Sequence, residues 1–330
     1  MTRAVVIGLG DVSSVHLAAI AAMPDVELVG VCDTDPAAAA ATGLPAELFH
    51  TDHRAMLAEV RPDVAHVCTP HDQHAPVAVD CIEAGVHVVL EKPLAHSVGE
   101  AERITAAAAA HPEVKVAVCF QNRYNRPSQE ARRLLEEGTL GRSLGATATV
   151  MWHRTPAYYA AKPWRGQRRR SGGGVLINQA IHTLDLLRWL LGDVTSVGSR
   201  IGTHALADVI DVEDTAYLVL QHERGCSSVL FATVAHAVDA PVAIEITCER
   251  GTLRLCGDLT VTHADGRTEM VPERVAPGVG RSYWGVSHEL LIADFHDRLA
   301  EQGPFWIGPA EGMAALRILD DVYRDDVSRP

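Results

Sequence analysis

Residues 4–13 read AVVIGLGDVS, a short apolar strand that runs into two glycines and then into the start of a helix. Gly8 is placed to make the tight turn, and Gly10 to let the backbone approach a pyrophosphate resting on the helix N-terminus. Ser13 stands where a third glycine is usual, and it is small enough for close packing of helix on strand. A strand, a glycine turn and a helix in this order predict a dinucleotide-binding Rossmann fold.

The second predicted strand, Val26–Cys32, ends in Asp33. An acidic residue at this point accepts hydrogen bonds from the adenosine ribose hydroxyls and repels a 2′-phosphate. No arginine follows in residues 34–36, so the pattern favours NAD over NADP. Asp33 has an alternative role as the N-cap of a helix over Pro36–Thr42, and the two roles are compatible.

Strands and helices alternate through the first half of the chain, which predicts a parallel sheet with right-handed crossovers. Further helices are expected over Asp52–Val60, Gln73–Ala84 and Val98–Ala110, and further strands over Asp63–Cys68, Val86–Leu90 and Val114–Cys119. The carboxyl ends of such strands lie along one edge of the sheet, where ligands bind. The residues at this edge are Thr69, Pro70 and His71, then Glu91, Lys92 and Pro93, then Phe120, Gln121, Asn122 and Arg123.

The stretch VHVVLEKPL, Val86–Leu94, is a buried strand that ends abruptly in a charged pair. Charges at the end of a buried strand are costly unless they have a function there. Lys92 is therefore a candidate catalytic cation, and Pro93 stiffens the backbone that carries it. The alternative is a lysine in a solvent-facing loop. Glu91 either holds Lys92 in place or balances its charge.

The second half begins with a strand pattern over Leu144–Trp152 and reaches a second chemical feature, a helix expected over Val175–Leu191. Asn178, His182 and Asp185 are spaced so that they share one helix face. A lone histidine in a buried helix is more often structural than catalytic. Here its neighbours are polar, and the preceding triple glycine, residues 172–174, lets another group approach closely.

Alternating patterns separated by turn signals follow, and they predict a largely antiparallel sheet. Its strands are expected over Thr215–Gln221, Ser227–Val234, Val242–Thr247 and Thr252–Cys256, with later helices through about Leu299 and over Ala310–Tyr323. The fold class is therefore α/β, with a Rossmann domain over residues 1–122 and a C-terminal α+β domain over residues 123–330.

Composition limits the possible partners. The 330 residues carry 29 Lys and Arg against 42 Asp and Glu, a net charge of −13, which disfavours nucleic acid. No apolar run approaches the roughly 18 residues of a membrane span, and the chain starts directly with a strand, so we expect no signal peptide. The seven cysteines form no C-x-x-C pair and several lie in apolar runs, which indicates reduced thiols and a cytoplasmic protein. No metal-ligand spacing appears, so we expect no metal.

The order of these motifs resembles the glucose–fructose oxidoreductase/inositol dehydrogenase family, Gfo/Idh/MocA. The resemblance rests on GLG followed by His16, on CDTDP at residues 32–36, and on TPHDQHAPVAVDCIEAGVHVVLEKPL at residues 69–94. It covers the whole chain and implies an NAD-dependent dehydrogenase of a small sugar or cyclitol. It also implies an open-faced sheet that pairs subunits into a homo-oligomer, a dimer or tetramer.

Residue roles follow from the resemblance. His182 corresponds to the catalytic base, Lys92 to its cationic partner, and Asn178 stands where the family often has aspartate; it can orient a group but cannot take a proton. The implied cofactor-binding residues are Gly8, Gly10, Asp11, Val12, Asp33, Thr69, Pro70, His71, His74, Glu91, Lys92 and Gln121. The implied substrate-binding residues are Lys92, Arg123, Tyr124, Trp164, Arg165, Asn178, His182 and Tyr283.

Two questions stay open at this stage. The arginines at positions 165, 168, 169 and 170 belong either to a solvated or subunit-pairing loop, or to a site for an anionic group of the substrate. For the whole protein, the leading interpretation is oxidation of a secondary hydroxyl of a sugar, aminosugar, nucleotide-sugar or cyclitol. The alternatives are an NADP-dependent keto-sugar reductase and a non-catalytic dinucleotide sensor or regulatory protein.

Overall fold

The structure, a computed structural model, describes residues 1–274 and 287–327. Within these residues the chain forms two compact units. Residues 1–121 cluster with the segment that ends at Met313, and residues 122–274 cluster with the segment that starts at Ala314. The predicted boundary at 122/123 lies next to the first of these divisions, whereas the segment that ends at Met313 packs with the N-terminal residues.

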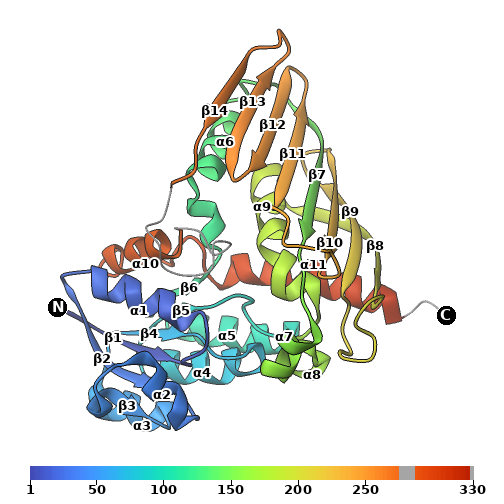
Figure 1. The fold of residues 1–330 in the computed structure, drawn as a ribbon. Helices are drawn as coiled ribbons and strands as arrows, with labels where there is room; N and C mark the ends of the chain where they lie inside the picture. Colours follow the sequence, from blue (N-terminus) through green and yellow to red (C-terminus); the bar gives the residue numbers. More distant parts are fainter. Residues whose placement is uncertain (275–286, 328–330) are drawn as a thin grey trace. The chain divides into compact units, whose positions relative to one another are not determined.

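The first unit is built on a six-stranded parallel sheet in the order β3-β2-β1-β4-β5-β6. Its strands are β1 (Thr2–Ile7), β2 (Val26–Cys32), β3 (Phe49–His50), β4 (Val64–Val67), β5 (His87–Leu90) and β6 (Val116–Val118). Its helices are α1 (Ser13–Ala22), α2 (Pro36–Thr42), α3 (His53–Val60), α4 (His71–Glu83), α5 (Val98–Ala110) and α10 (Ser287–Asp297), with a 3-10 turn η1 (Ala46–Leu48). Helix α1 packs against α10 on one face of the sheet, and α4 packs against α5 on the other (Figure 1).

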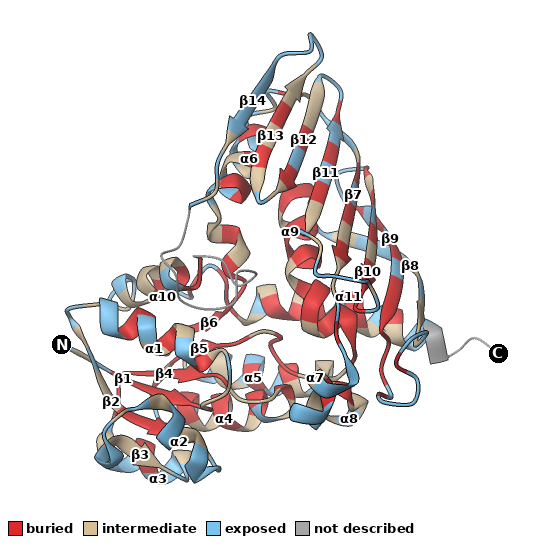
Figure 2. Ribbon diagram, in the orientation of Figure 1, coloured by how far each residue is buried: buried red, intermediate tan, exposed pale blue. Residues whose placement is uncertain are grey.

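Coverage on both faces explains the strand sequences. Every residue of β4 is buried, and β5 is buried from Val88 onward (Figure 2). Strands covered on both sides read as continuous apolar runs rather than as alternating ones. The predicted Rossmann sheet is confirmed, and the predicted bounds of β2, α2 and α5 match the structure. The two-residue strand β3 is too short to give a sequence signal.

The second unit is built on an eight-stranded sheet in the order β14-β13-β12-β11-β7-β10-β9-β8. Its strands are β7 (Ser143–Met151), β8 (Val194–Gly202), β9 (Thr215–His222), β10 (Ser227–Thr233), β11 (Ala243–Cys248), β12 (Gly251–Cys256), β13 (Asp258–His263) and β14 (Thr268–Val271). All pairs in this order are antiparallel except β7 with β10. The predicted, mostly antiparallel sheet is therefore confirmed.

Helices α6 (Arg126–Glu136) and α9 (Ile181–Leu191) cover one face of this sheet. The remaining helical segments are α7 (Pro156–Ala161), α8 (Arg168–Ser171) and α11 (Pro309–Val327), which begins in the first unit, with 3-10 turns η2 (Gln121–Tyr124) and η3 (Pro163–Gly166) and a π-helical turn η4 (Leu176–Ala180). Helix α6 packs on β12, β13 and β14, and α9 packs on β7 (Figure 1). On the opposite face β9 alternates exposed and buried residues, with Tyr217 and Val219 about half exposed (51% and 46%). The sheet is thus open on one side.

All seven cysteines are unpaired thiols, and all but Cys256 are buried. Among the described residues, no helix combines the length and apolar character needed to cross a membrane.

Candidate active site

The glycine loop after β1 has the form that the sequence predicts. Gly8 has a positive φ of 90°, and a Cβ there would lie 2.8 Å from backbone atoms of Cys68 and Thr69. Only glycine fits such a position. A Cβ added at Gly10 would meet nothing within 4 Å, so the loop has open space above that residue.

Two further features show that a dinucleotide fits this loop. Helix α1 starts without a side-chain cap and without an acidic residue in its first turn, so its N-terminus is suited to an anion. The Asp33 carboxylate accepts one hydrogen bond at each oxygen, from Leu9 N (2.7 Å) and from Asp35 N (2.9 Å). A carboxylate oxygen can accept a second hydrogen bond, which leaves Asp33 able to receive ribose hydroxyls.

The alternative role of Asp33 as a helix cap is wrong. The N-cap of α2 is Asp35, whose carboxylate accepts the Ala37 N–H at 2.9 Å. Asp33 instead ties the start of α2 to the glycine loop.

The predicted cofactor-binding residues follow five strands that are neighbours in the sheet. Gly8–Val12 follow β1, Asp33 follows β2, Thr69–His71 follow β4, Glu91 and Lys92 follow β5, and Gln121 comes shortly after β6. His74 is fully buried in α4, where its ring nitrogens lie 3.0 Å from the Thr69 carbonyl and 2.7 Å from the Pro93 carbonyl. His74 therefore links the loops that follow β4 and β5.

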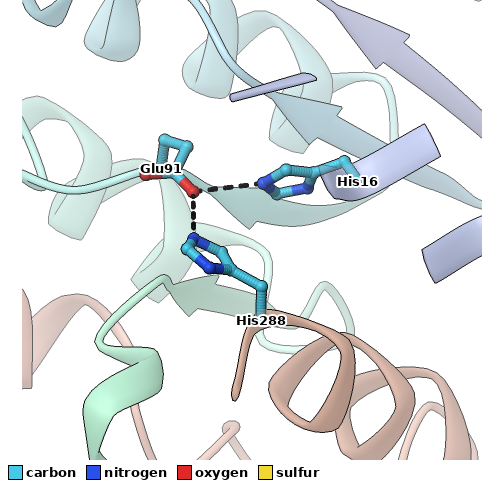
Figure 3. Close-up of side chains that lie close together, drawn as sticks. All are labelled: His16, Glu91 and His288. Atoms are coloured by element: carbon cyan, nitrogen blue, oxygen red, sulfur yellow. Dashed lines mark hydrogen bonds and ion pairs between the residues drawn. The ribbon is translucent and has the colours of Figure 1, made fainter. Parts of the chain in front are cut away.

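Glu91 is the centre of a buried cluster beside Lys92 (Figure 3). His16 from α1 and His288 from α10 each place Nε2 3.1 Å from Glu91 Oε1, while Oε2 accepts the Lys92 backbone N–H at 3.3 Å. Burial by itself would raise the pKa of Glu91, but the hydrogen bonds from the two imidazoles outweigh it and hold the pKa well below its usual value. Lys92 is half-buried in a stretch, residues 91–95, that is otherwise buried.

The ligand atoms of His16, Glu91 and His288 lie within 4.8 Å of one another, which is a spacing that a metal ion could bridge. The expectation of no metal rested on spacing along the chain, and these residues come from three distant segments. His16 belongs to the motifs behind the family resemblance, but no sequence pattern indicated that it meets Glu91 and His288.

In the second unit, Asn178 and His182 occupy the open side of an otherwise buried helical stretch. Between Leu176 and Leu191 the residues that are not buried are Asn178, His182 and Trp189. The predicted helix over Val175–Leu191 is helical throughout, but its first turn, η4, is π-helical and the regular α-helix α9 begins only at Ile181. Single π-turns within helices are frequent at functional sites.

Glu213 holds the start of this helical stretch. Its carboxylate accepts the backbone N–H of Gly174 (2.8 Å) and of Leu176 (3.0 Å), and the Tyr323 hydroxyl from α11 at 3.1 Å. A Cβ on Gly174 would lie 1.9 Å from the Glu213 carbonyl oxygen, and one on Gly173 would lie 2.0 Å from the Tyr323 hydroxyl. The group that approaches the triple glycine closely is therefore a part of the chain itself.

Comparison with known proteins identifies the family. Residues 2–120 match the oxidoreductase family with an NAD-binding Rossmann fold, and residues 128–254 match the GFO/IDH/MocA C-terminal domain. The chain belongs to the Gfo/Idh/MocA family. Residues 2–120 are thus the NAD-binding domain of an oxidoreductase.

Several dehydrogenases resemble the chain over most of its length. D-apiose dehydrogenase of Paraburkholderia graminis is 29% identical over 276 residues, covering 80% of this chain and 70% of the relative. Inositol 2-dehydrogenase 2 of Saccharopolyspora erythraea is 28% identical, covering 78% and 74%. The structure of the WlbA dehydrogenase from Bordetella pertussis, solved with NADH and UDP-GlcNAcA, is 31% identical with a TM-score of 0.84, covering 99% and 97%.

Two residues that the family resemblance pointed to have internal partners. Arg123 is buried (1% exposed) and makes a bidentate ion pair with the equally buried Asp185, at 2.6 and 2.8 Å. The Arg123 guanidinium also lies over the Trp189 ring at 5.7 Å. Asp185 is therefore buried in an ion pair with Arg123, whereas Asn178 and His182 are half-buried.

The arginine-rich loop of this family member also makes internal contacts. The Arg165 guanidinium lies 4.5 Å from the ring centre of Tyr158, and the Arg168 guanidinium lies 4.8 Å from that of Tyr323 and 4.0 Å from Glu213. These contacts agree better with a structural loop than with an anion site. The other predicted substrate residues are placed as follows: Tyr124 is half-buried in η2, Trp164 is half-buried in η3, and Tyr283 lies outside the described residues.

Proposed function

We propose that this enzyme is an NAD-dependent dehydrogenase that oxidises a secondary hydroxyl of a sugar, aminosugar, nucleotide-sugar or cyclitol. One observation carries the proposal: Lys92 and the pair Asn178 and His182 are half-buried in stretches whose neighbours are buried. Lys92 offers a cation and His182 offers an acid–base group, and each side chain is partly accessible. The names of the relatives, which include dehydrogenases of apiose, inositol and levoglucosan, support this class of substrate.

In this mechanism His182 removes the proton of the substrate hydroxyl, and Lys92 donates a hydrogen bond to the same oxygen as negative charge develops on it. General-base catalysis of this kind contributes about 10²–10⁴-fold, and the cation adds electrostatic stabilisation. Asn178, one helical turn before His182, orients the hydroxyl or the imidazole. Bound NAD supplies the hydride acceptor. Tyr124, Trp164, Arg165 and Tyr283 are proposed to contact the substrate.

The test is to replace Lys92 and His182 separately by alanine and to follow NADH formation on a panel of sugars and cyclitols. We expect turnover to fall at least about 100-fold in each variant because each loses a transition-state contact. NADH binding, measured by fluorescence titration, should persist. The exposed residues Lys162 and His204 serve as matched controls, and their alanine variants should keep wild-type turnover. Near-normal kcat in both active-site variants would rule the mechanism out.

The open face of the eight-stranded sheet is the proposed contact between subunits of a homo-oligomer. Val229 of β10 lies opposite Val219 of β9 and Phe231 opposite Tyr217, and this group forms an apolar, partly exposed patch. Contiguous apolar patches of this kind mark interaction surfaces. Val229→Lys should lower the mass measured by light scattering, whereas Val238→Lys in an exposed loop should not. An unchanged mass for Val229→Lys would count against this surface.

A further inference from the structure

The buried cluster around Glu91 extends into a chain of histidines. His16 Nδ1 lies 2.9 Å from Nδ1 of His66, which stands in the middle of β4. His66 Nε2 lies 3.2 Å from Nε2 of His296, near the end of α10. His16 and His66 are fully buried, and His296 is half-buried. Three imidazoles therefore connect the edge of the first unit to Glu91, and the proposed mechanism uses none of them.

When the Glu91 carboxylate is the acceptor, the hydrogen bonds of this histidine chain can run in one direction only. A neutral imidazole has one N–H donor and one acceptor nitrogen. The Glu91 carboxylate accepts, so His16 carries its proton on Nε2 and presents a lone pair at Nδ1. His66 must then donate from Nδ1 and accept at Nε2, which leaves His296 to donate from Nε2. The N–H groups of His16, His66 and His296 therefore all point toward Glu91.

The opposite direction, which a metal ion on Glu91, His16 and His288 would require, leaves two buried donors without an acceptor. It needs protons on Nδ1 of His288 and Nδ1 of His296, and among the described residues neither atom has a hydrogen-bond partner. A buried N–H without a partner is rarer and more costly than a bare lone pair. The donor pattern therefore favours a hydrogen-bonded carboxylate over a metal site.

The three imidazoles of this histidine chain are also neutral near pH 7. Burial lowers the pKa of His16, although Glu91 opposes this shift. Burial and the neighbouring histidines lower the pKa of His66 well below its usual value. Burial, opposed by Asp297, lowers the pKa of His296 to about 4. Protonation of His296 would keep its Nε2 donor, so the direction of the chain survives acidification at that end.

We propose that His66 and His296, acting through His16, are positioning residues that hold Glu91 as a fixed anion next to Lys92. This inference rests on the proposed function, because its purpose is to keep the catalytic lysine in place. Glu91 Oε2 receives the Lys92 backbone N–H, and the Cys119 thiol is also hydrogen-bonded to the carboxylate. A buried carboxylate persists only if donors replace its hydration. Loss of a donor frees Glu91 to move or to take up a proton, and the Lys92 backbone loses its acceptor.

A pair of conservative variants at one buried position tests this. In His66→Asn the amide nitrogen takes the place of Nδ1, so the donor to His16 is kept. In His66→Gln the amide nitrogen takes the place of Nε2, so that donor is lost. One neutral hydrogen bond contributes about 0.5–1.5 kcal/mol, so we expect kcat of His66→Gln to fall roughly 3- to 10-fold with the KM for NAD unchanged. His66→Asn should stay within about 2-fold of wild type.

A merely structural role would affect both variants alike, because both introduce an amide at the same site. Equal losses of kcat, or losses that track the melting temperature, would overturn the proposal. Both variants should therefore be compared at matched thermal stability, measured by calorimetry.

A second readout does not depend on activity. Nitrogen-15 spectra of the full-length protein should show His16 protonated at Nε2 and His66 at Nδ1, and added Zn²⁺ should leave both signals unchanged. Stoichiometric Zn²⁺ binding that shifts the His16 and His288 signals would overturn the proposal in favour of a metal site. Turnover that persists in Lys92→Ala while the tautomer pattern is intact would instead reject the proposed function and leave the histidine chain standing.

Discussion

Two glutamates, one in each unit, are buried to nearly the same extent, but their pKa values are shifted in opposite directions. The Glu91 side chain is 7% exposed and that of Glu213 is 1% exposed. Burial raises the pKa of Glu213, and the hydrogen bonds from Leu176 and Gly174 only partly oppose it. Burial acts on Glu91 in the same direction, yet the pKa of Glu91 is well below its usual value.

The difference lies in the donors rather than in the depth of burial. Glu91 receives imidazole N–H groups from two helices, and the hydrogen bond between His66 and His16 keeps the His16 donor pointed at it. Glu213 receives the first amides of a helical stretch, a tyrosine hydroxyl and a distant arginine. Glu91 is thus arranged to stay charged beside Lys92, whereas Glu213 is arranged to anchor the helical stretch that carries Asn178 and His182.

The largest effect on stability is expected at a third buried carboxylate, Asp185. Asp185 is held by the bidentate guanidinium of Arg123. Arg123→Met removes that partner and leaves the buried carboxylate with only the more distant Arg188, 4.0 Å away, which should lower the free energy of unfolding by about 3–5 kcal/mol. Urea denaturation measures the loss. In the double variant with Asp185→Leu most of the stability should return, because no unpaired charge remains; a double variant as unstable as the single one would contradict this account.

A substitution at Gly174 disrupts the Glu213 anchor from the side of the glycine turn. Gly174→Ala places a Cβ within 1.9 Å of the Glu213 carbonyl oxygen. Because the obstacle is backbone, the helix start must move, and we expect a loss of about 1–3 kcal/mol together with a fall in kcat. Gly198→Ala in β8 is the matched control, since a Cβ there meets nothing within 4 Å. Equal stability of the two variants would show that the anchor is unimportant.

Sequence reasoning found the parts of the molecule whose signals are local. The glycine loop, Asp33, the order of strands and helices, and the polar pair Asn178 and His182 all follow from spacing along the chain. The predicted bounds of α2 and α5 also match the structure. These features depend on neighbours within a few residues, and the sequence displays them directly.

It missed the features that only tertiary contacts create. His66 lies in an apolar strand pattern and His296 in an ordinary helix, so nothing along the chain brings them to His16. The triple glycine was correctly taken as a place of close approach, but the approaching residues, Glu213 and Tyr323, are distant in sequence. The family resemblance assigned Arg123 to the substrate, and nothing along the chain indicated its ion pair with Asp185, 62 positions away. In each case the sequence showed one side of a tertiary contact and not the residue on the other side.

The smallest expected effect is the dependence of stability on pH, and it has opposite signs at the two glutamates. A glutamate has an ordinary pKa of 4.5 in the unfolded chain. Because the pKa of Glu91 is lowered by folding, its contribution is present above pH 4.5 and is lost as the pH falls through the lowered value. Because the pKa of Glu213 is raised, its contribution is complete below pH 4.5 and is lost as the pH rises through the raised value.

These signs are measurable as stability differences from the isosteric variants Glu91→Gln and Glu213→Gln between pH 3 and pH 7, each pKa unit corresponding to about 1.4 kcal/mol. Relative to its glutamine variant, the wild type should lose stability on acidification for Glu91 and on alkalisation above pH 4.5 for Glu213. Amide substitution also alters hydrogen bonding at each site, and at position 91 it removes the charge that raises the pKa of His16. Slopes of the same sign would mean that burial, and not the donors supplied to each carboxylate, decides its charge.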